Sequence, residues 1–169
     1  HGVMQDRSLI QAALSLSNIV ESNKWISTSF NRLERQINSF TSDDGVHLEH
    51  SPFYHVYTLQ LYQGVQELIE DKGISLSSSI FEKLDKMKEY LAYILKPDLT
   101  IPYIGDSTYY KLSEDFENEY LRFVLTNGKH GTKPPAIDKV FNDAGVSIFR
   151  DNWWIGDDYS NMSQLIFQA

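Results

Sequence analysis

The stretch "SPFYHVYTLQLYQGVQELIEDKG" (residues 51–73) predicts a long helix whose start and end are both marked in the sequence. Ser51 is a favourable N-cap residue, and Pro52 stands at the first helical position, where proline is well tolerated. Gly73 closes the segment, as glycine often does after a helix. Apolar side chains recur between them at spacings of three and four residues: Tyr54, Tyr57, Leu61, Val65 and Leu68. We expect this stripe to pack against other helices.

The same period predicts helices on both sides of this one. Residues from about 3 to 20 and from about 24 to 40 carry apolar side chains at helical spacing. These are Ile10, Ala13 and Leu14 in the first segment and Phe30, Leu33, Ile37 and Phe40 in the second. Downstream, Ser79 and Glu82 form a capping box that predicts the start of a fourth helix, which Pro97 ends. Its stripe is Ile80, Leu84, Met87, Leu91 and Ile94.

A fifth helix is expected after the loop "IPYIGDS" (residues 101–107), with acidic residues in its first turn, where the helix dipole favours them. These residues are Glu114, Asp115 and Glu117. After "NGKHGTKPP" (residues 127–135) the pattern alternates between apolar and polar residues around turns at 143–145 and 156–158, which predicts two or three antiparallel strands. We therefore expect a mainly α chain with a C-terminal β part, divided into a helical portion (1–133) and a β portion (134–169). Antiparallel helix pairs, as an α/α toroid or a plain bundle, fit the helical portion.

Composition excludes several classes of function. The 169 residues carry a formal net charge of −8, which disfavours binding to nucleic acid or to an anionic membrane surface. The chain has no cysteine, so disulfides and thiolate metal sites are absent. No apolar run approaches the length of a membrane span, so we expect no membrane insertion. Because the chain starts at His1 and stops after a strand pattern, we expect it to be part of a longer protein.

Titratable groups gather just before and inside the helix that opens at Ser51. The segment "DDGVHLEHSPFYHVY" (residues 43–57) holds three histidines, three carboxylates and two tyrosines. Active sites often collect groups of such different pKa, and the amides at a helix N-terminus attract anions. A structural interpretation stays open, in which Tyr54 and Tyr57 are core aromatics, His55 is structural and the acidic residues form a solvated loop.

Three other interpretations also stay open. The spacing of His47 and Glu49 is a weak metal signal, and we assign no metal site. Asp43, Asp44 and Glu49 could supply the two carboxylates of a glycoside hydrolase on an α/α barrel. The helices could instead form a carbohydrate-binding scaffold without catalysis. In that case the tryptophans would stack on sugar rings: Trp25, Trp153 and Trp154.

Four segments, in order, resemble the heparinase II/III-type polysaccharide lyases. "DGVHLEHSPFYH" (44–55) is similar to a family segment with Asp-Gly, an acidic residue, Ser-Pro or Gly-Pro, and a tyrosine. "HGVMQDRSLIQAAL" (1–14) resembles the Asn-His-Gly segment, cut after the asparagine. "IPYIGDS" (101–107) and "FNDAGVSIFR" (141–150) resemble a toroid loop and the entry to the β-sandwich. The resemblance implies an α/α toroid followed by the first strands of a β-sandwich.

The resemblance also implies an activity, β-elimination on uronic-acid polysaccharides such as heparan-like, alginate-like or capsular polymers. The enzyme must neutralise the uronate carboxylate, remove the C5 proton and protonate the leaving oxygen. By matching motifs, Tyr54 is the catalytic tyrosine, with Tyr57 as the fallback. His1 matches the family histidine, and Glu49 matches the acidic residue before Ser-Pro. His47, His50 and Trp25 are expected to bind substrate.

Other expectations follow from the same resemblance. The catalytic asparagine would precede His1, and a His-rich β-domain segment, which holds a metal in some members, would follow Ala169. We therefore expect no cofactor in this chain and only part of a site, inactive alone. The partner would be an acidic polysaccharide, and the location periplasmic or extracellular; the oligomeric state is not predicted.

Overall fold

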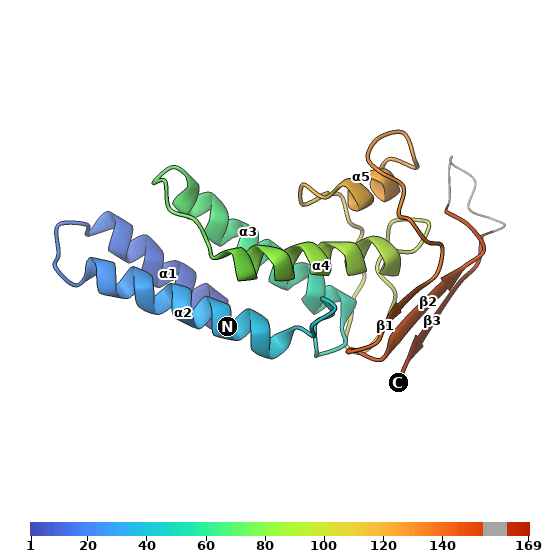
Figure 1. Ribbon diagram of the computed structural model, residues 1–169, viewed down its shortest axis with the longest axis horizontal. Helices are drawn as coiled ribbons and strands as arrows, with labels where there is room; N and C mark the ends of the chain where they lie inside the picture. Colours follow the sequence, from blue (N-terminus) through green and yellow to red (C-terminus); the bar gives the residue numbers. More distant parts are fainter. Residues whose placement is uncertain (154–161) are drawn as a thin grey trace.

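The computed structural model describes residues 1–153 and 162–169, and in this part the chain forms five helices and a three-stranded antiparallel sheet. The helices are α1 (Gly2–Ser15), α2 (Ser22–Phe40), α3 (Pro52–Glu70), α4 (Ser78–Ile94) and α5 (Glu119–Leu125). The strands are β1 (Lys139–Phe141), β2 (Val146–Arg150) and β3 (Gln164–Gln168). Figure 1 shows the sheet at one end of the molecule, beside the C-terminal end of α4.

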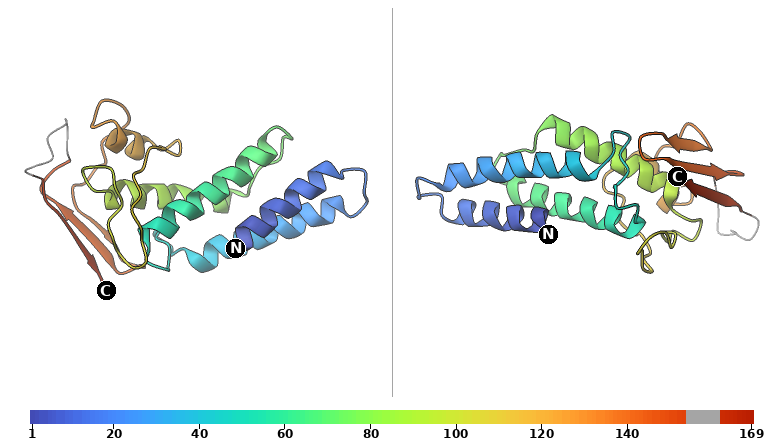
Figure 2. Two further views of the ribbon diagram at one scale, coloured as in Figure 1. Left: turned by 180° about the vertical axis from the view of Figure 1, so that it is seen from behind. Right: turned by 90° about the horizontal axis from the view of Figure 1, so that it is seen from below.

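The four long helices form two antiparallel hairpins, α1 with α2 and α3 with α4 (Figures 1 and 2). The hairpins pack on each other through α1 against α3 and α2 against α4. Leu33 and Ile37 of α2 are buried as predicted, and so is Ile10 of α1. The first helix ends at Ser15, earlier than the predicted end near residue 20. No helix in the described ranges is both long enough and apolar enough to cross a membrane.

The buried face of α3 differs from the predicted stripe. Of the five residues in that stripe, only Val65 is buried, while Tyr54 and Tyr57 are 36% and 37% exposed. The buried residues of α3 are Pro52, His55, Val56, Leu59, Tyr62, Val65 and Ile69. Apolar residues surround most of this helix, so its 3.6-residue period alone does not select one face. Contacts with α1 and α4 select the buried face, and the two tyrosines are left at an open surface.

The predicted stripe of α4 is confirmed, because all five of its residues are buried. The prediction of a capping box at the start of α4 is wrong. The helix begins at Ser78, and Ser77 stands at the N-cap without a side-chain hydrogen bond to the helix. The hydroxyl of Ser79 instead donates to the carboxylate of Glu34 on α2. The hydroxyl of Ser79 is therefore used in a contact between α4 and α2 and not in capping α4.

The fifth helix begins later than the sequence predicts. It starts at Glu119, after the three acidic residues that were expected in its first turn. Asn118 is its N-cap, and the side-chain oxygen accepts hydrogen bonds from the amides of Tyr120 and Leu121, both at 3.1 Å. The asparagine cap is thus the stronger start signal here.

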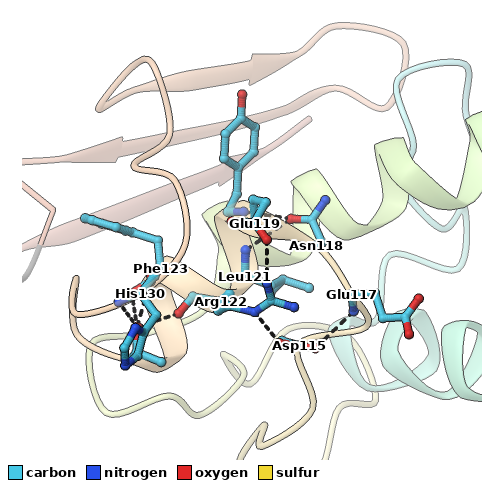
Figure 3. A network of polar contacts seen from close by, with 10 residues as sticks. Asp115, Glu117, Asn118, Glu119, Leu121, Arg122, Phe123 and His130 are labelled. Atoms are coloured by element: carbon cyan, nitrogen blue, oxygen red, sulfur yellow. Dashed lines mark hydrogen bonds and ion pairs between the residues drawn. The ribbon is translucent and has the colours of Figure 1, made fainter.

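The acidic residues before α5 form a turn instead. Asp115 accepts a hydrogen bond from the amide of Glu117 at 3.0 Å and another from Nε of Arg122 at 2.8 Å (Figure 3). Phe116 and Glu117 adopt positive φ angles of 48° and 57°, which no α-helix allows. These contacts lower the pKa of Asp115, first through the amide of Glu117 and then through Arg122.

The predicted strands are confirmed as a meander in which β2 lies between β1 and β3. The predicted turn at 143–145 joins β1 to β2, and Gly145 supplies its positive φ of 66°. Arg150 joins the sheet to the helices by donating to the carbonyl oxygens of Tyr93 and Leu95 at the end of α4. The predicted turn at 156–158 and Trp154 lie outside the described residues. The limits of the two domains stay a prediction.

Candidate active site

A cleft of about 900 Å³ lies where the C-terminal half of α2 meets the N-terminal half of α3. The start of α1 and the loop between α2 and α3 complete its walls. Its lining residues are His1, Gly2, Val3, Arg32, Arg35, Gln36, Ile37, Ser39, Phe40, Thr41, His47, Glu49, Tyr54, Tyr57, Thr58, Leu61 and Tyr62. A cleft of this size accommodates a small-molecule ligand or several sugar residues. Four of the predicted site residues line it: His1, Glu49, Tyr54 and Tyr57, together with the predicted substrate ligand His47.

The wall from α2 is basic. Four polar residues of α2 lie on one face of the helix and line the cleft, because they follow one another at helical spacing: Arg32, Arg35, Gln36 and Ser39. Nε of Arg32 lies 3.2 Å from Oδ1 of Asp6, a buried carboxylate on α1, and Nε2 of Gln36 donates to Oδ2 of Asp6 at 2.6 Å. Asp6 therefore holds Arg32 and Gln36 in place.

Arg35 differs from Arg32. Its side chain is exposed, and among the described residues it has no ion pair and no hydrogen bond. Sequence reasoning missed both arginines. The segment "RLERQ" (32–36) does contain the signal, because it sets two arginines one turn apart beside an apolar stripe.

The wall from α3 carries the tyrosines. The hydroxyl of Tyr54 has no hydrogen-bond partner in the part of the chain that the structure describes, whereas that of Tyr57 contacts Sδ of Met4 at 3.4 Å. Tyr62 lies deeper, and its hydroxyl donates to the carbonyl of Leu33 at 2.7 Å. Burial raises the pKa of Tyr62 far above its usual range. Tyr54 thus presents the freest phenol to the cleft.

The loop between α2 and α3 closes one end of the cleft. The two ends of this loop run antiparallel and are joined by an isolated β-bridge between Thr41 and His47. The amide of Glu49 donates to Nδ1 of His47 at 3.3 Å. Burial lowers the pKa of His47, while Glu49 acts in the opposite direction. The ring is therefore neutral at pH 7, with its hydrogen on Nε2, and it can donate one hydrogen bond.

Two of the residues predicted to bind substrate, His50 and Trp25, do not line the cleft. His50 adopts a positive φ of 53° and does not line it. Trp25 lies seven residues before Arg32 on α2, which is roughly 10 Å along a helix axis. The side chain of His55, predicted to be structural, is buried beneath the loop and bonds the carbonyl of Met87 at 2.9 Å.

The two aspartates proposed for a hydrolase also lie elsewhere. Asp43 pairs with Lys83 at 3.0 Å, and that contact lowers the pKa of Asp43. Oδ2 of Asp44 accepts the amide of Asp143 from the β1–β2 turn at 2.8 Å. Within residues 1–153 and 162–169, Glu49 is the only carboxylate that lines the cleft, and no group of three metal-ligating side chains occurs.

The family model "Heparinase II/III N-terminus" matches residues 1–128. The chain belongs to the heparinase II/III family. Among its curated relatives in that family, a heparin-sulfate lyase of Bacteroides stercoris is 23% identical and aligns with 96% of this chain and 26% of its own length. A heparin-sulfate lyase of Pedobacter heparinus is 24% identical, with 90% of this chain and 25% of its own length covered. The chain spans about a quarter of these relatives.

Solved heparinase structures share the fold. A heparinase III gene product with methylated lysines superposes with a TM-score of 0.84 at 22% identity, covering 99% of this chain and 27% of its own. The heparan sulfate lyase of Pedobacter heparinus gives a TM-score of 0.80 at 22% identity, covering 99% and 28%. The five helices and the small antiparallel sheet thus belong to a heparinase II/III fold.

Proposed function

We propose that this chain carries part of the active site of a polysaccharide lyase that cleaves uronic-acid polymers by β-elimination. The observation that carries the proposal is the cleft itself: a free tyrosine hydroxyl, a neutral histidine and two arginines meet in it, with a single carboxylate. Membership of the heparinase II/III family and relatives named heparin-sulfate lyase support the same chemistry.

Tyr54 is assigned to proton transfer. A tyrosine phenol is protonated at neutral pH and can donate to the leaving oxygen at C4. Its place in the first turn of a capped helix fixes the backbone from which the ring projects, since the hydroxyl of Ser51 accepts the amide of Tyr54 at 3.4 Å. Tyr57 is the second choice, because its hydroxyl is already in contact with Met4.

His47 is assigned to the substrate carboxylate, and the imidazole of His1, the other histidine that lines the cleft, is assigned to accept the C5 proton. A neutral imidazole that donates from Nε2 stabilises the negative charge that develops when the C5 proton leaves. Glu49 holds the tautomer of His47 through its backbone amide, and its carboxylate is free to accept from a sugar hydroxyl. Trp25 and His50 lie away from this cleft, so a role for them would require substrate to extend beyond it.

The hydrolase alternative is weaker. An inverting or retaining glycosidase needs two carboxyl groups across the scissile bond, and the described cleft wall offers Glu49 alone. Asp43 and Asp44 are occupied by Lys83 and by the β1–β2 turn. A purely binding scaffold would not require the free phenol of Tyr54.

The proposed assembly follows the family: the helix pairs form part of an α/α toroid, and the three strands begin a β-sandwich. The substrate would be an acidic polysaccharide, and a periplasmic or extracellular location would suit an enzyme acting on it.

The test uses the protein that carries this chain in full. It is incubated with heparan-type, chondroitin-type, alginate and capsular uronates, and the ultraviolet absorbance of the unsaturated product is followed. Tyr54→Phe should lower kcat at least roughly 100-fold, the lower end of the range for loss of one general acid–base group, while Tyr57→Phe retains activity. Product without a double bond, lost in Glu49→Gln but kept in Tyr54→Phe, would establish a hydrolase instead.

A further inference from the structure

The two arginines of the basic wall are in different situations. Arg32 is committed to the buried carboxylate of Asp6, whose other oxygen accepts from Gln36. Arg35 is one turn further along the same face and lines the same cleft, but no carboxylate of the described residues pairs with it. On α2, Arg32 is thus held in an ion pair within the protein, whereas Arg35 has no ion pair among the described residues.

This arrangement leaves an unpaired cation in the cleft of an acidic chain. The whole sequence has a net charge of −8 and Asp6 balances the charge of Arg32, yet Arg35 lines the cleft with no carboxylate of the described residues paired to it. A concave site concentrates the field of its lining charges, so the guanidinium of Arg35 can attract an anionic group that enters the cleft. A guanidinium binds carboxylate and sulfate oxygens with two parallel N–H groups.

We propose that Arg35 is a specificity-determining residue that binds an anionic group of the polysaccharide, a carboxylate or a sulfate, in the cleft that contains Tyr54. The inference rests on the proposed lyase function and adds the residue that selects acidic sugars. The Asp6–Arg32–Gln36 cluster is the support of this subsite, because it fixes the turn of α2 from which Arg35 projects. Arg35 itself acts in binding and does not take part in proton transfer.

The role of Arg35 can be tested by substitution without loss of the fold, because its side chain is exposed and has no ion pair or hydrogen bond among the described residues. Replacing Arg32 would confuse the result, since it leaves Asp6 buried without its ion pair. A matched control exists on the same helix. Lys24 is exposed, carries the same charge and does not line the cleft, so Lys24→Gln removes one positive charge from α2 elsewhere.

Turnover is measured first, in the protein that carries this chain in full. Arg35→Gln should raise KM roughly ten-fold with kcat nearly unchanged, because a charged hydrogen bond to substrate is lost equally in ground and transition states. Arg35→Lys should recover part of the loss, and Lys24→Gln should behave as wild type. The salt dependence of kcat/KM should be shallower in Arg35→Gln.

Binding is then measured in a Tyr54→Phe background, with a heparan sulfate tetrasaccharide and its desulfated counterpart. If Arg35→Gln raises the Kd of both tetrasaccharides by the same factor, the carboxylate is the bound group. If it raises only the Kd of the sulfated tetrasaccharide, the sulfate is the bound group. An unchanged Kd, or an equal loss in Lys24→Gln, would overturn the inference while wild-type turnover leaves the lyase proposal standing. If wild type forms no unsaturated product, the lyase proposal fails. If the Tyr54→Phe protein with Arg35 intact binds neither tetrasaccharide, the inference about Arg35 fails.

Discussion

The backbone amide of His47 donates a hydrogen bond to Nδ1 of His55 at 3.4 Å, and Nε2 of His55 bonds the carbonyl of Met87 at 2.9 Å. The ring of His55 therefore links the cleft loop to α4. Accepting at Nδ1 and donating at Nε2 requires the neutral form. The loop that carries His47 and Glu49 thus depends on an uncharged imidazole beneath it.

Stability should consequently fall in mild acid. Burial lowers the pKa of His55 to about 3, whereas an unfolded histidine titrates near 6.5. Between these values the unfolded chain binds the extra proton, so the free energy of unfolding decreases as pH falls, by about 1.4 kcal/mol per pH unit. His47 contributes with the same sign, because its pKa is also lowered by burial.

Urea unfolding at pH 7 and pH 5 measures this effect. The loss expected from His55 over that interval is about 2 kcal/mol. His55→Gln should reduce the pH-dependence, while His130→Gln, at an exposed histidine, should keep it. A His55→Gln variant with the full acid sensitivity of wild type would show that His55 is not the buried neutral group.

Gly45 in the loop between α2 and α3 should not tolerate a side chain. Its φ is +92°, and an added Cβ would lie 2.4 Å from the backbone carbonyl carbon of Lys86 on α4. Gly45→Ala should therefore cost roughly 2–4 kcal/mol, from strain and from displacement of the helix backbone, and should also lower activity by shifting His47.

Gly73 provides the matched control for Gly45. It has a φ of +65°, but nothing lies within 4 Å of an added Cβ. Gly73→Ala should cost only the conformational strain, about 1 kcal/mol. Urea unfolding of both variants gives the comparison, and equal losses would contradict the steric argument at Gly45.

Arg150 should be essential for docking the sheet onto the helices. It is buried, donates to the carbonyls of Tyr93 and Leu95, and lies over the ring of Trp153 with its guanidinium carbon 4.5 Å from the centroid. Arg150→Met keeps the length of the side chain but leaves the last carbonyls of α4 with fewer donors. We expect a loss of roughly 3 kcal/mol in the free energy of unfolding.

The control for Arg150 is Lys129→Met, at an exposed position, which should change stability by less than about 0.5 kcal/mol. Gln164 donates to the carbonyl of Tyr93 at 3.0 Å and sustains part of the junction in the variant. If Arg150→Met were as stable as Lys129→Met, the junction would rest on Gln164 and aromatic packing.

The sequence by itself determined the order of helices and strands. The α4 stripe could be predicted because its five residues recur at helical spacing. The start of the helix that opens at Ser51 could be predicted because its cap and its proline act locally. Family membership and the presence of Tyr54, His47 and Glu49 near one cleft were also predictable, since all three lie within eight residues of each other.

Tertiary structure alone decided which face of α3 is buried, where α5 begins and which cations line the cleft. Tyr54 is open to the cleft because α1 and α4 cover the other sides of its helix, and Arg35 is free because Asp6, on a different helix, pairs with Arg32. Local patterns specify periodicity and caps, which depend on neighbours within about four residues. The choice among equivalent faces and partners depends on contacts between segments far apart in the chain, and no local pattern contains them.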